Sequence, residues 1–286
     1  MSVLSRTRRL SALSLASAVL VTGCQSAHES SRDTSGAPPD RFARRLLSVD
    51  FDDLGSGPVV AAFNSAEGAV LDPVLAGAGA LQVVQGPGGD GSALGFPRDG
   101  DIRDGARAVL RVQTGDDHEF APEEADFGYG ADVFYDYLPV NSEDDNGDNV
   151  LQRGLFADVG QFKLQLDEGR PSCRVNGDDG ELLAKATEPI KAGQWYRLRC
   201  QRSDGALSLF LAPLTGSAPA PGSAEEADLP WQSWRTEGDV GSVTVSDPPA
   251  TLSIGGKLNA HGGVVEDAPD QFSGVLDNVT IGLIGE

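Results

Sequence analysis

The sequence predicts an all-β protein, a two-sheet antiparallel jelly-roll sandwich, and three observations lead to this. Apolar and polar side chains alternate with a period of two along many short runs past residue 45, and a helical period of 3.6 is almost absent there. The 286 residues include 36 Gly and 17 Pro, which favour turns over long helices. Turn signals such as Asn176-Gly177 and Asp204-Gly205 separate the runs. One face of each strand is apolar, so two sheets can bury these faces against each other.

Individual strands are expected wherever the alternation is clear. The clearest runs cover residues 48–52, 107–112, 127–135, 162–167, 196–201, 207–211, 243–245, 251–254 and 275–281. Two stretches interrupt the pattern. Residues 75–95 are rich in Gly and Ala, and residues 213–239 are rich in Pro and carry an acidic cluster. A loop as long as the second stretch is often a functional feature, or it is an insertion with local structure.

The overall charge excludes one class of partner. The chain has 43 Asp and Glu against 22 Lys and Arg, a formal net charge of -21. Nucleic acids and anionic lipid surfaces repel such a chain, so no nucleic-acid partner is expected. With 40 % hydrophobic residues, the chain has enough apolar material to form a packed core.

The first 23 residues have the features of an export signal. Arg6, Arg8 and Arg9 precede a short apolar segment at residues 10–22, which is too short to span a bilayer. The segment ends in Leu-Val-Thr-Gly-Cys24, which resembles the box of bacterial lipoproteins. In that family the cysteine is lipidated, so the resemblance implies a signal peptide at 1–23 and a lipid on Cys24 that anchors the protein on the extracytoplasmic side of the membrane. The alternative is an ordinary signal peptide followed by an incidental cysteine.

A tether is expected after the lipidation site. Residues 24–45 are rich in Ser, Asp, Pro and Gly with scattered charges, without a hydrophobic period. The folded domain is then expected at residues 46–286. Removal of residues 1–23 removes three arginines and no acid, which takes the net charge from -21 to -24.

Two cysteines remain in the expected domain. Cys173 and Cys200 both lie in strand-like runs, and an even pair in an exported chain predicts a disulfide. Closing the loop between them would stabilise the fold by roughly 3–4 kcal/mol in the chain-entropy model. The alternative is a pair of buried free thiols.

The run of strands resembles the laminin-G-like branch of the concanavalin A-like lectin and glucanase superfamily. The stretches that carry the resemblance are Gly160–Leu166, Gly169–Cys173, Gly193–Cys200, Leu252–Gly256 and Phe272–Ile281. The resemblance covers roughly residues 48–284 and implies a jelly roll whose first and last strands are adjacent. It does not determine a function, because lectins, adhesion modules and glucanases share this fold.

The sequence lacks the catalytic motif of the glucanase members. Their Glu-x-Asp-x-x-Glu strand supplies two carboxyl groups within range for retaining hydrolysis. The nearest match is Glu124-Ala-Asp126, but Tyr129 stands where the second Glu belongs. A tyrosine, with its usual pKa near 10, cannot replace that acid. His261 lies in no recognisable metal or triad spacing and is expected to be a loop residue. We therefore expect a protein that is not an enzyme.

Calcium is the metal that the acidic loops would suit, although no cofactor is expected to be required. Asp144 and Asp148 lie in an Asp-x-Asn-x-Asp run, which lacks the Gly and the final Glu of an EF-hand. The alternative for this run is a solvated hairpin tip. The family resemblance implies a second candidate, because some relatives bind a structural calcium with an Asp of the last strand, and Asp277 matches it. The alternative for Asp277 is hydrogen bonding to the neighbouring backbone.

The function most consistent with these features is a non-catalytic binding or adhesion module on the cell surface, for a glycan or a protein. Trp231 and Trp234 are the candidate ligand-binding residues, because aromatic rings stack on the apolar faces of sugars. The alternative is that they pin their long loop to the sandwich. Trp195 is assigned to the core. Two other functions stay open: a divergent glycoside hydrolase, which requires two carboxylates on the concave face of a sheet, and a structural envelope protein without a groove.

Overall fold

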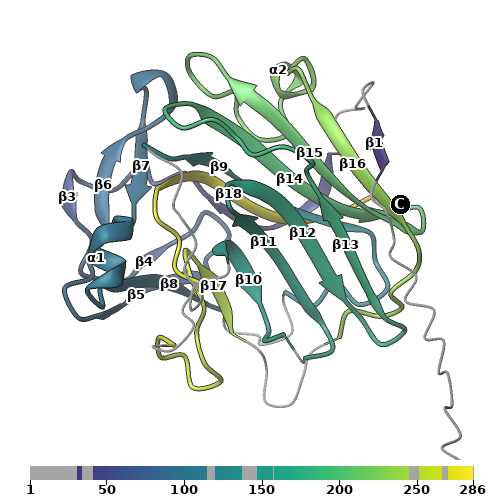
Figure 1. Ribbon diagram of the computed structural model, residues 1–286, viewed down its shortest axis with the longest axis horizontal. Helices are drawn as coiled ribbons and strands as arrows, with labels where there is room; N and C mark the ends of the chain where they lie inside the picture. Colours follow the sequence, from purple (N-terminus) through teal and green to yellow (C-terminus); the bar gives the residue numbers. More distant parts are fainter. Residues whose placement is uncertain are drawn as a thin grey trace, which may run out of the picture.

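The computed structural model describes residues 31–33, 41–114, 120–136, 147–156, 158–244, 251–265 and 270–285. These residues form two antiparallel sheets with only short helices outside them (Figure 1). The predicted fold class, an all-β two-sheet sandwich, is confirmed.

The first sheet has ten strands. Its spatial order is β1 (Ser31–Asp33), β16 (Gln232–Glu237), β15 (Ala206–Leu214), β14 (Trp195–Ser203), β9 (Phe127–Phe134), β18 (Val275–Ile284), β7 (Ser92–Gly95), β6 (Gln82–Gln85) and β3 (Gly57–Pro58), and β2 (Phe42–Val49) pairs with β18.

The second sheet has eight strands. Its spatial order is β13 (Glu181–Lys185), β12 (Arg170–Asn176), β11 (Gln161–Asp167), β10 (Asp148–Arg153), β17 (Leu252–Ile254), β8 (Arg107–Gln113), β5 (Val70–Ala76) and β4 (Phe63–Asn64).

The alternation in the sequence explains how the sheets pack. In β14, Tyr196, Leu198 and Cys200 point into the core, and the intervening side chains lie on the outer face of the ten-stranded sheet. Apolar side chains from both sheets form one continuous core. The Cys173–Cys200 disulfide is present and joins β12 of one sheet to β14 of the other, as the sequence predicts.

The first and last long strands are adjacent, as the family resemblance implies. Strand β2 pairs antiparallel with β18, from Val49 opposite Val279 to Phe42 opposite Ile284. This pairing corrects the predicted boundary of the tether, because residues 42–45 are already part of the sheet. In addition, β1 pairs with β16 inside the segment that the sequence predicts to be unstructured. Cys24 lies outside the described residues.

One predicted strand is matched only in part by the described residues. Of residues 243–245, only Val243 is bridged, to Glu123, and residue 245 lies outside the described part of the chain. Of the two stretches that interrupt the alternation, the Gly-rich one at 75–95 contains β6 and β7. The Pro-rich one at 213–239 contains β16, which is the alternative of an insertion with local structure. Short, half-exposed strands such as β6 bury too few side chains to give a clear alternation.

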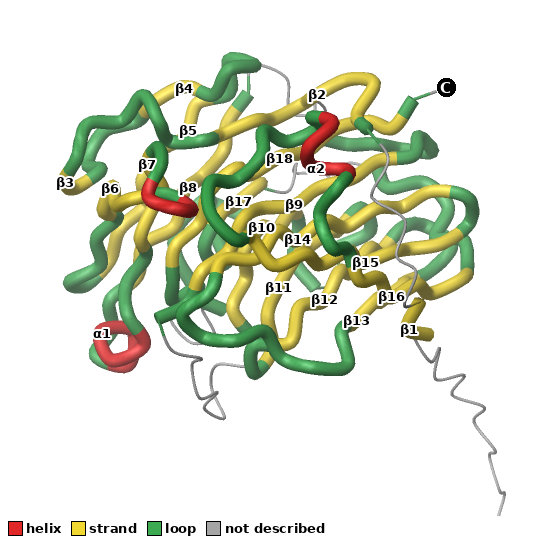
Figure 2. The backbone as a smooth tube through the Cα atoms, turned by 90° about the horizontal axis from the view of Figure 1, so that it is seen from above, coloured by secondary structure: helices red, strands yellow, loops and turns green. Residues whose placement is uncertain are grey.

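The helices are short and lie outside the two layers of strands (Figure 2). They are α1 (Asp99–Arg103) and α2 (Ala224–Ala227), with a 3₁₀ turn at Pro87–Gly89. In the part of the chain that the structure describes, no helix has the length and apolar character needed to cross a bilayer.

Candidate binding groove

A groove of about 550 Å³ lies on the outer face of the ten-stranded sheet. Its floor is one row of side chains that crosses five neighbouring strands. The register places Gln82 of β6 opposite Gly95 of β7, Gly95 opposite Val275 of β18, Val275 opposite Phe134 of β9, and Phe134 opposite Trp195 of β14. At about 4.8 Å between strands, the row is on the order of 19 Å long.

The floor of the groove is largely apolar and aromatic. Phe134 and Trp195 are half-buried and tilted against each other, with ring centroids 5.4 Å apart. Val275 continues this surface. Gly95 has no side chain, so the groove is deeper at its position. The result is an extended strip of aromatic and aliphatic surface that solvent reaches.

Polar groups surround this strip. Gln82 and Gln85 are exposed along β6, and Gln85 Nε2 donates to Gly89 O at 3.0 Å. Across the groove, Arg98 and Asp136 form an exposed ion pair at 3.7 Å. Asp136 is the only carboxylate among the described residues that line the groove.

Two loops meet to close one side of the groove. The loop at residues 86–91 contacts the beginning of a strap, which we define as residues 215–231 between β15 and β16. Gly88 has a φ of 67°, and a Cβ there would lie 2.3 Å from the backbone of Gly216. Only glycine allows this approach. The Ser217 hydroxyl also hydrogen-bonds to the carboxylate of Asp90, which ties the two loops together.

The strap covers Arg197 and Arg199 on this outer face, and a buried network of charges holds it there. Arg197 makes two hydrogen bonds of 2.7 Å to Asp132, and both side chains are fully buried. Glu226 of α2 approaches Arg197 at 3.1 Å and Arg199 at 3.2 Å. The two guanidinium groups lower the pKa of Glu226, although its burial opposes this. The network therefore carries two acids and two bases and is close to neutral.

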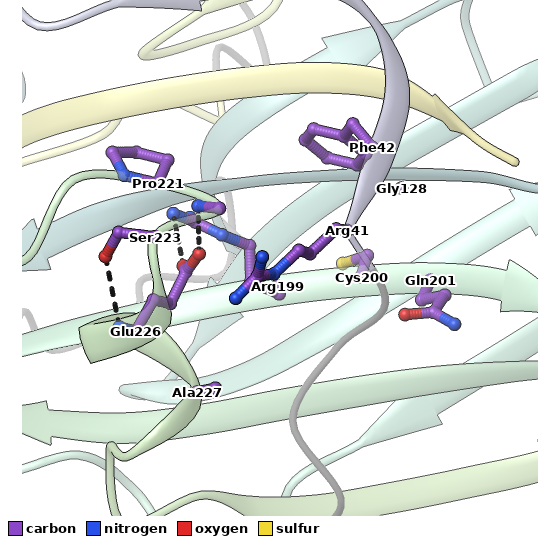
Figure 3. A pocket seen from close by; sticks show the side chains of 11 residues that line it. Arg41, Phe42, Gly128, Arg199, Cys200, Gln201, Pro221, Ser223, Glu226 and Ala227 are labelled. Atoms are coloured by element: carbon purple, nitrogen blue, oxygen red, sulfur yellow. Dashed lines mark hydrogen bonds and ion pairs between the residues drawn. The ribbon is translucent and has the colours of Figure 1, made fainter.

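Figure 3 shows how α2 is held over Arg199. Ser223 caps the helix, its hydroxyl accepting the Glu226 backbone N–H at 3.2 Å, while the Glu226 carboxylate accepts the N–H of Gly222. Arg41 and Phe42, at the start of β2, line the other side of the small pocket beside Arg199. Its volume is about 40 Å³, so the strap leaves little open space here.

A bulge in β18 places two more polar side chains beside Asp132. Asn278 interrupts the register between Asp277 and Thr280 and has a φ of 48°, which asparagine tolerates better than most residues. Its Nδ2 donates to Asp132 Oδ2 at 2.9 Å and to Asp277 Oδ2 at 3.1 Å. The burial of Asp277, together with the charges of Asp132, Asp52 and Asp50, raises its pKa to about 8.

The two predicted calcium ligands that the structure describes, Asp148 and Asp277, are hydrogen-bonded to other protein groups. Among the described residues, no three carboxylate, imidazole or thiol groups are arranged to hold a metal ion. Asp277 accepts hydrogen bonds from the backbone and side chain of Asn278, which is the alternative considered for it. Asp148 is buried in β10 and accepts a 2.7 Å hydrogen bond from the hydroxyl of Tyr135. Asp144 lies outside the described residues.

The prediction that Trp231 and Trp234 bind a ligand is wrong. Trp231 is 6 % exposed and packs against Phe210 and Ala212, and its indole N–H donates to Glu226 O at 3.0 Å. Trp234 is 2 % exposed and belongs to the main core. Both residues instead hold the strap and β16 against the sheet, which is the alternative considered for them.

Tyr129, at the position of the missing catalytic Glu, is a core residue. Its hydroxyl donates to backbone carbonyls of Lys163 and Arg174 at 3.2 and 3.0 Å, and burial raises its pKa. Among the buried carboxylates, Asp132 and Asp277 are opposite each other in register. The side chains of Arg197 and Asn278, however, already donate hydrogen bonds to the Asp132 carboxylate. Neither of the two lines the groove.

The groove residues that sequence reasoning missed are Trp195 and Phe134. Trp195 was expected in the core, and the structure places it in the groove instead. The signal was present, because Tyr196, Leu198 and Cys200 alternate inward and Trp195 therefore belongs to the opposite face. Phe134 lies between Val133 and Tyr135, which are buried in the core, so its side chain also belongs to the opposite face. Their proximity depends on the pairing of β9 with β14, which the sequence does not show.

Comparisons with known proteins yield distant structural likenesses. No family model matches the chain, and no curated protein matches its sequence. Mouse laminin alpha1 chain, domains LG4-5, is similar at 18 % identity and a TM-score of 0.37, over 56 % of this chain and 36 % of that one. Tailspike protein 2 of bacteriophage CBA120 is similar at 13 % identity and a TM-score of 0.46, over 75 % of this chain and 29 % of that one. The chain thus spans about a third of the length of these two structures.

A third likeness covers nearly the whole of its counterpart. Domain 4 of AbnA, a GH43 extracellular arabinanase from Geobacillus stearothermophilus, whose structure is in complex with arabinotriose, is similar at 12 % identity and a TM-score of 0.46. The match covers 85 % of this chain and 95 % of that one. At TM-scores below 0.5, these likenesses are too distant to indicate a function.

Proposed function

We propose that this protein is a non-catalytic glycan-binding module that a lipid on Cys24 anchors to the cell surface. The observation that carries the proposal is the row from Gln82 to Trp195. A sugar chain lying along it would place the apolar faces of its rings on Phe134 and Trp195. Its hydroxyl groups would meet the polar rim formed by Gln82, Gln85, Arg98 and Asp136.

The shape and chemistry of the groove favour binding over the other two functions. A hydrolase requires two carboxyl groups at the scissile bond, whereas Asp136 is the single carboxylate among the described lining residues and pairs with Arg98. A purely structural envelope protein would have no reason to expose Trp195 and Phe134 in a groove. The glycan is also favoured over a protein partner, because the floor is a narrow strip rather than a broad apolar patch.

The replacement Trp195→Ala tests the groove. We expect at least a tenfold loss of affinity for any glycan that the wild-type protein retains on an array or an insoluble polysaccharide, because the stacking surface at the end of the row is removed. Phe156→Ala is the matched control, since Phe156 is an aromatic residue that is 74 % exposed on another part of the surface. Thermal unfolding of both variants separates lost binding from lost folding. Unchanged glycan binding by Trp195→Ala would refute the assignment of the groove.

The membrane anchor has its own test. We expect the wild-type protein in the membrane fraction of an expressing bacterium and the Cys24→Ser variant in the soluble exported fraction, because the variant cannot be lipidated. A diacylated cysteine is a durable two-chain anchor. A membrane-bound Cys24→Ser variant would contradict lipid anchoring at this residue.

A further inference from the structure

The charged side chains at the groove neutralise each other. Among the described residues that line it, Arg98 and Asp136 are the two that carry a charge, and they pair with 3.7 Å between Arg98 Nη2 and Asp136 Oδ2. Both side chains are exposed, so solvent screens the pair and it contributes little to the stability of the fold. Its effect on binding is local, because a group that approaches Arg98 also meets the negative charge of Asp136.

The chain beside this rim adds acids and no bases. Residues 137–146, which follow Asp136 in the sequence, contain three acids and no Lys or Arg. The protein as a whole carries a formal net charge of -21. An anionic polymer near the groove is therefore repelled, most strongly at low salt, and the one cation among the described lining residues is already paired.

The other polar side chains of the rim suit uncharged partners. Gln82 and Gln85 are both exposed along β6 and carry primary amides. An amide donates and accepts hydrogen bonds, as a sugar hydroxyl does, and requires no charge on its partner. One N–H of Gln85 donates to Gly89 O at 3.0 Å, which holds this amide beside the groove. The hydroxyl groups of an uncharged chain can therefore bind here without leaving a charge unpaired.

The length of the floor favours a chain over a single sugar. The row from Gln82 to Trp195 crosses five strands and is on the order of 19 Å long. Phe134 and Trp195, with ring centroids 5.4 Å apart, supply two neighbouring stacking surfaces. Val84 and Val275 add aliphatic surface to the same groove. A single sugar ring stacks on one aromatic ring, so contact with the whole floor requires several linked sugars.

We propose that the groove selects uncharged polysaccharides, bound along several consecutive sugars, and that Asp136 rejects anionic ones by neutralising Arg98. This inference rests on the proposed function and narrows its ligand to one chemical class. Chains that carry uronate, sulfate or sialic acid groups are excluded. Binding of the uncharged chain should depend little on ionic strength, because no new ion pair forms in the complex.

The test compares polymers that differ only in charge. Soluble β-glucan, xylan, galactan and α-glucan are each titrated as the uncharged chain and as its carboxymethyl derivative, which keeps the backbone and adds carboxylates. Calorimetry at a fixed, low ionic strength measures both affinities. We expect the protein to bind at least one uncharged polymer, and to bind its carboxymethyl form at least about tenfold more weakly. Trp195→Ala should abolish this binding.

Reversing the charge at the rim tests the role of Asp136. Asp136→Lys should raise the affinity for the carboxymethyl polymer, relative to the uncharged one, by at least about tenfold, because two cations then face the chain. Glu237→Lys is the matched control, since it changes the net charge equally at a residue that is 72 % exposed. Glu237 is opposite Ala206 at the start of β15, whereas Trp195 is opposite Leu214 at its end. The control should keep the wild-type ratio.

The outcomes separate this inference from the proposed function. If the wild type binds a carboxymethyl polymer as tightly as the uncharged one, and Trp195→Ala abolishes both, the groove binds glycans without selecting against charge and the inference alone fails. If Asp136→Lys keeps the wild-type ratio, Asp136 does not determine the selectivity. If no polymer of the panel binds, glycan binding fails and the inference fails with it.

Discussion

Asp277 shows how one bulge creates an unusual ionisable group. The bulge at Asn278 places the Asp277 carboxyl group beside Asp132, in a position that is 5 % exposed. Arg197 and Asn278 donate hydrogen bonds to Asp132 and together engage both of its carboxylate oxygens. Among the described residues, only Asn278 donates hydrogen bonds to Asp277, so burial and neighbouring acids favour its protonated form.

We expect Asp277 to make the stability of the fold depend on pH. Its folded pKa of about 8 lies above the value near 3.9 of an unfolded Asp, so its contribution is fully present below pH 4 and is lost as the pH rises towards 8. The Asp277→Asn variant has no carboxyl group to ionise at this position, so it does not lose this stability as the pH rises. The variant should therefore be more stable than the wild type at pH 8.5 by a few kcal/mol, at about 1.4 kcal/mol per pKa unit, and of similar stability at pH 4.

Urea unfolding at several pH values measures this difference. Asp136→Asn is the control, since Asp136 is an exposed acid in the groove and should leave the slope of stability against pH nearly unchanged. If wild type and Asp277→Asn show parallel curves from pH 4 to 8.5, the carboxyl group is not protonated in the folded state.

At the scale of elements, the disulfide and the strap act on different faces of β14. Cys200 points into the core and binds Cys173 of β12, which joins the two sheets. Arg197 and Arg199 point outward from the same strand and hold the strap through Glu226. Strand β14, whose first residue is Trp195, is therefore held on its core face by the disulfide and on its outer face by the strap.

Removal of the disulfide should cost about 3–4 kcal/mol, because the unfolded chain regains the entropy of a loop with a sequence separation of 27. The double variant Cys173→Ala/Cys200→Ala, followed by urea unfolding, measures this cost. Each single variant with a free thiol serves as a comparison for the loss of side-chain packing. A double variant as stable as the wild type would show that the cross-link contributes nothing to the fold.

At the scale of the whole molecule, one continuous core joins the two sheets. Apolar side chains from both sheets fill it, and four charged residues on the outer face pair with one another in the Asp132–Arg197–Glu226–Arg199 network. The described carboxylates that the sequence suggested as calcium ligands are engaged by protein donors. That the fold requires no cofactor stays a prediction from the sequence.

We accordingly expect the unfolding temperature to be the same in EDTA and in millimolar calcium chloride. Magnesium chloride at the same ionic strength controls for screening of the net charge of -21. A rise that is specific to calcium and that Asp277→Asn abolishes would restore a calcium site at the last strand.

Several features of the molecule could be predicted from the sequence because they depend on local patterns. The period of two along residues 127–135 and 196–201 determines which side chains face the core, and hence the sandwich and the cross-link between its two remaining cysteines. Export and lipidation at Cys24 likewise remain predictions of a local motif.

The sites depend on contacts between strands far apart in the chain, which no local pattern reports. The groove exists because β6, β7, β18, β9 and β14 lie side by side in an order unrelated to their sequence, and this brings Trp195 next to Phe134. The same pairing directs Arg197 to Asp132, and the strap buries Trp231. The sequence by itself therefore determined which face of each strand is apolar, whereas only the tertiary structure decided which outward side chains meet, because strand order is set by the packing of the whole chain.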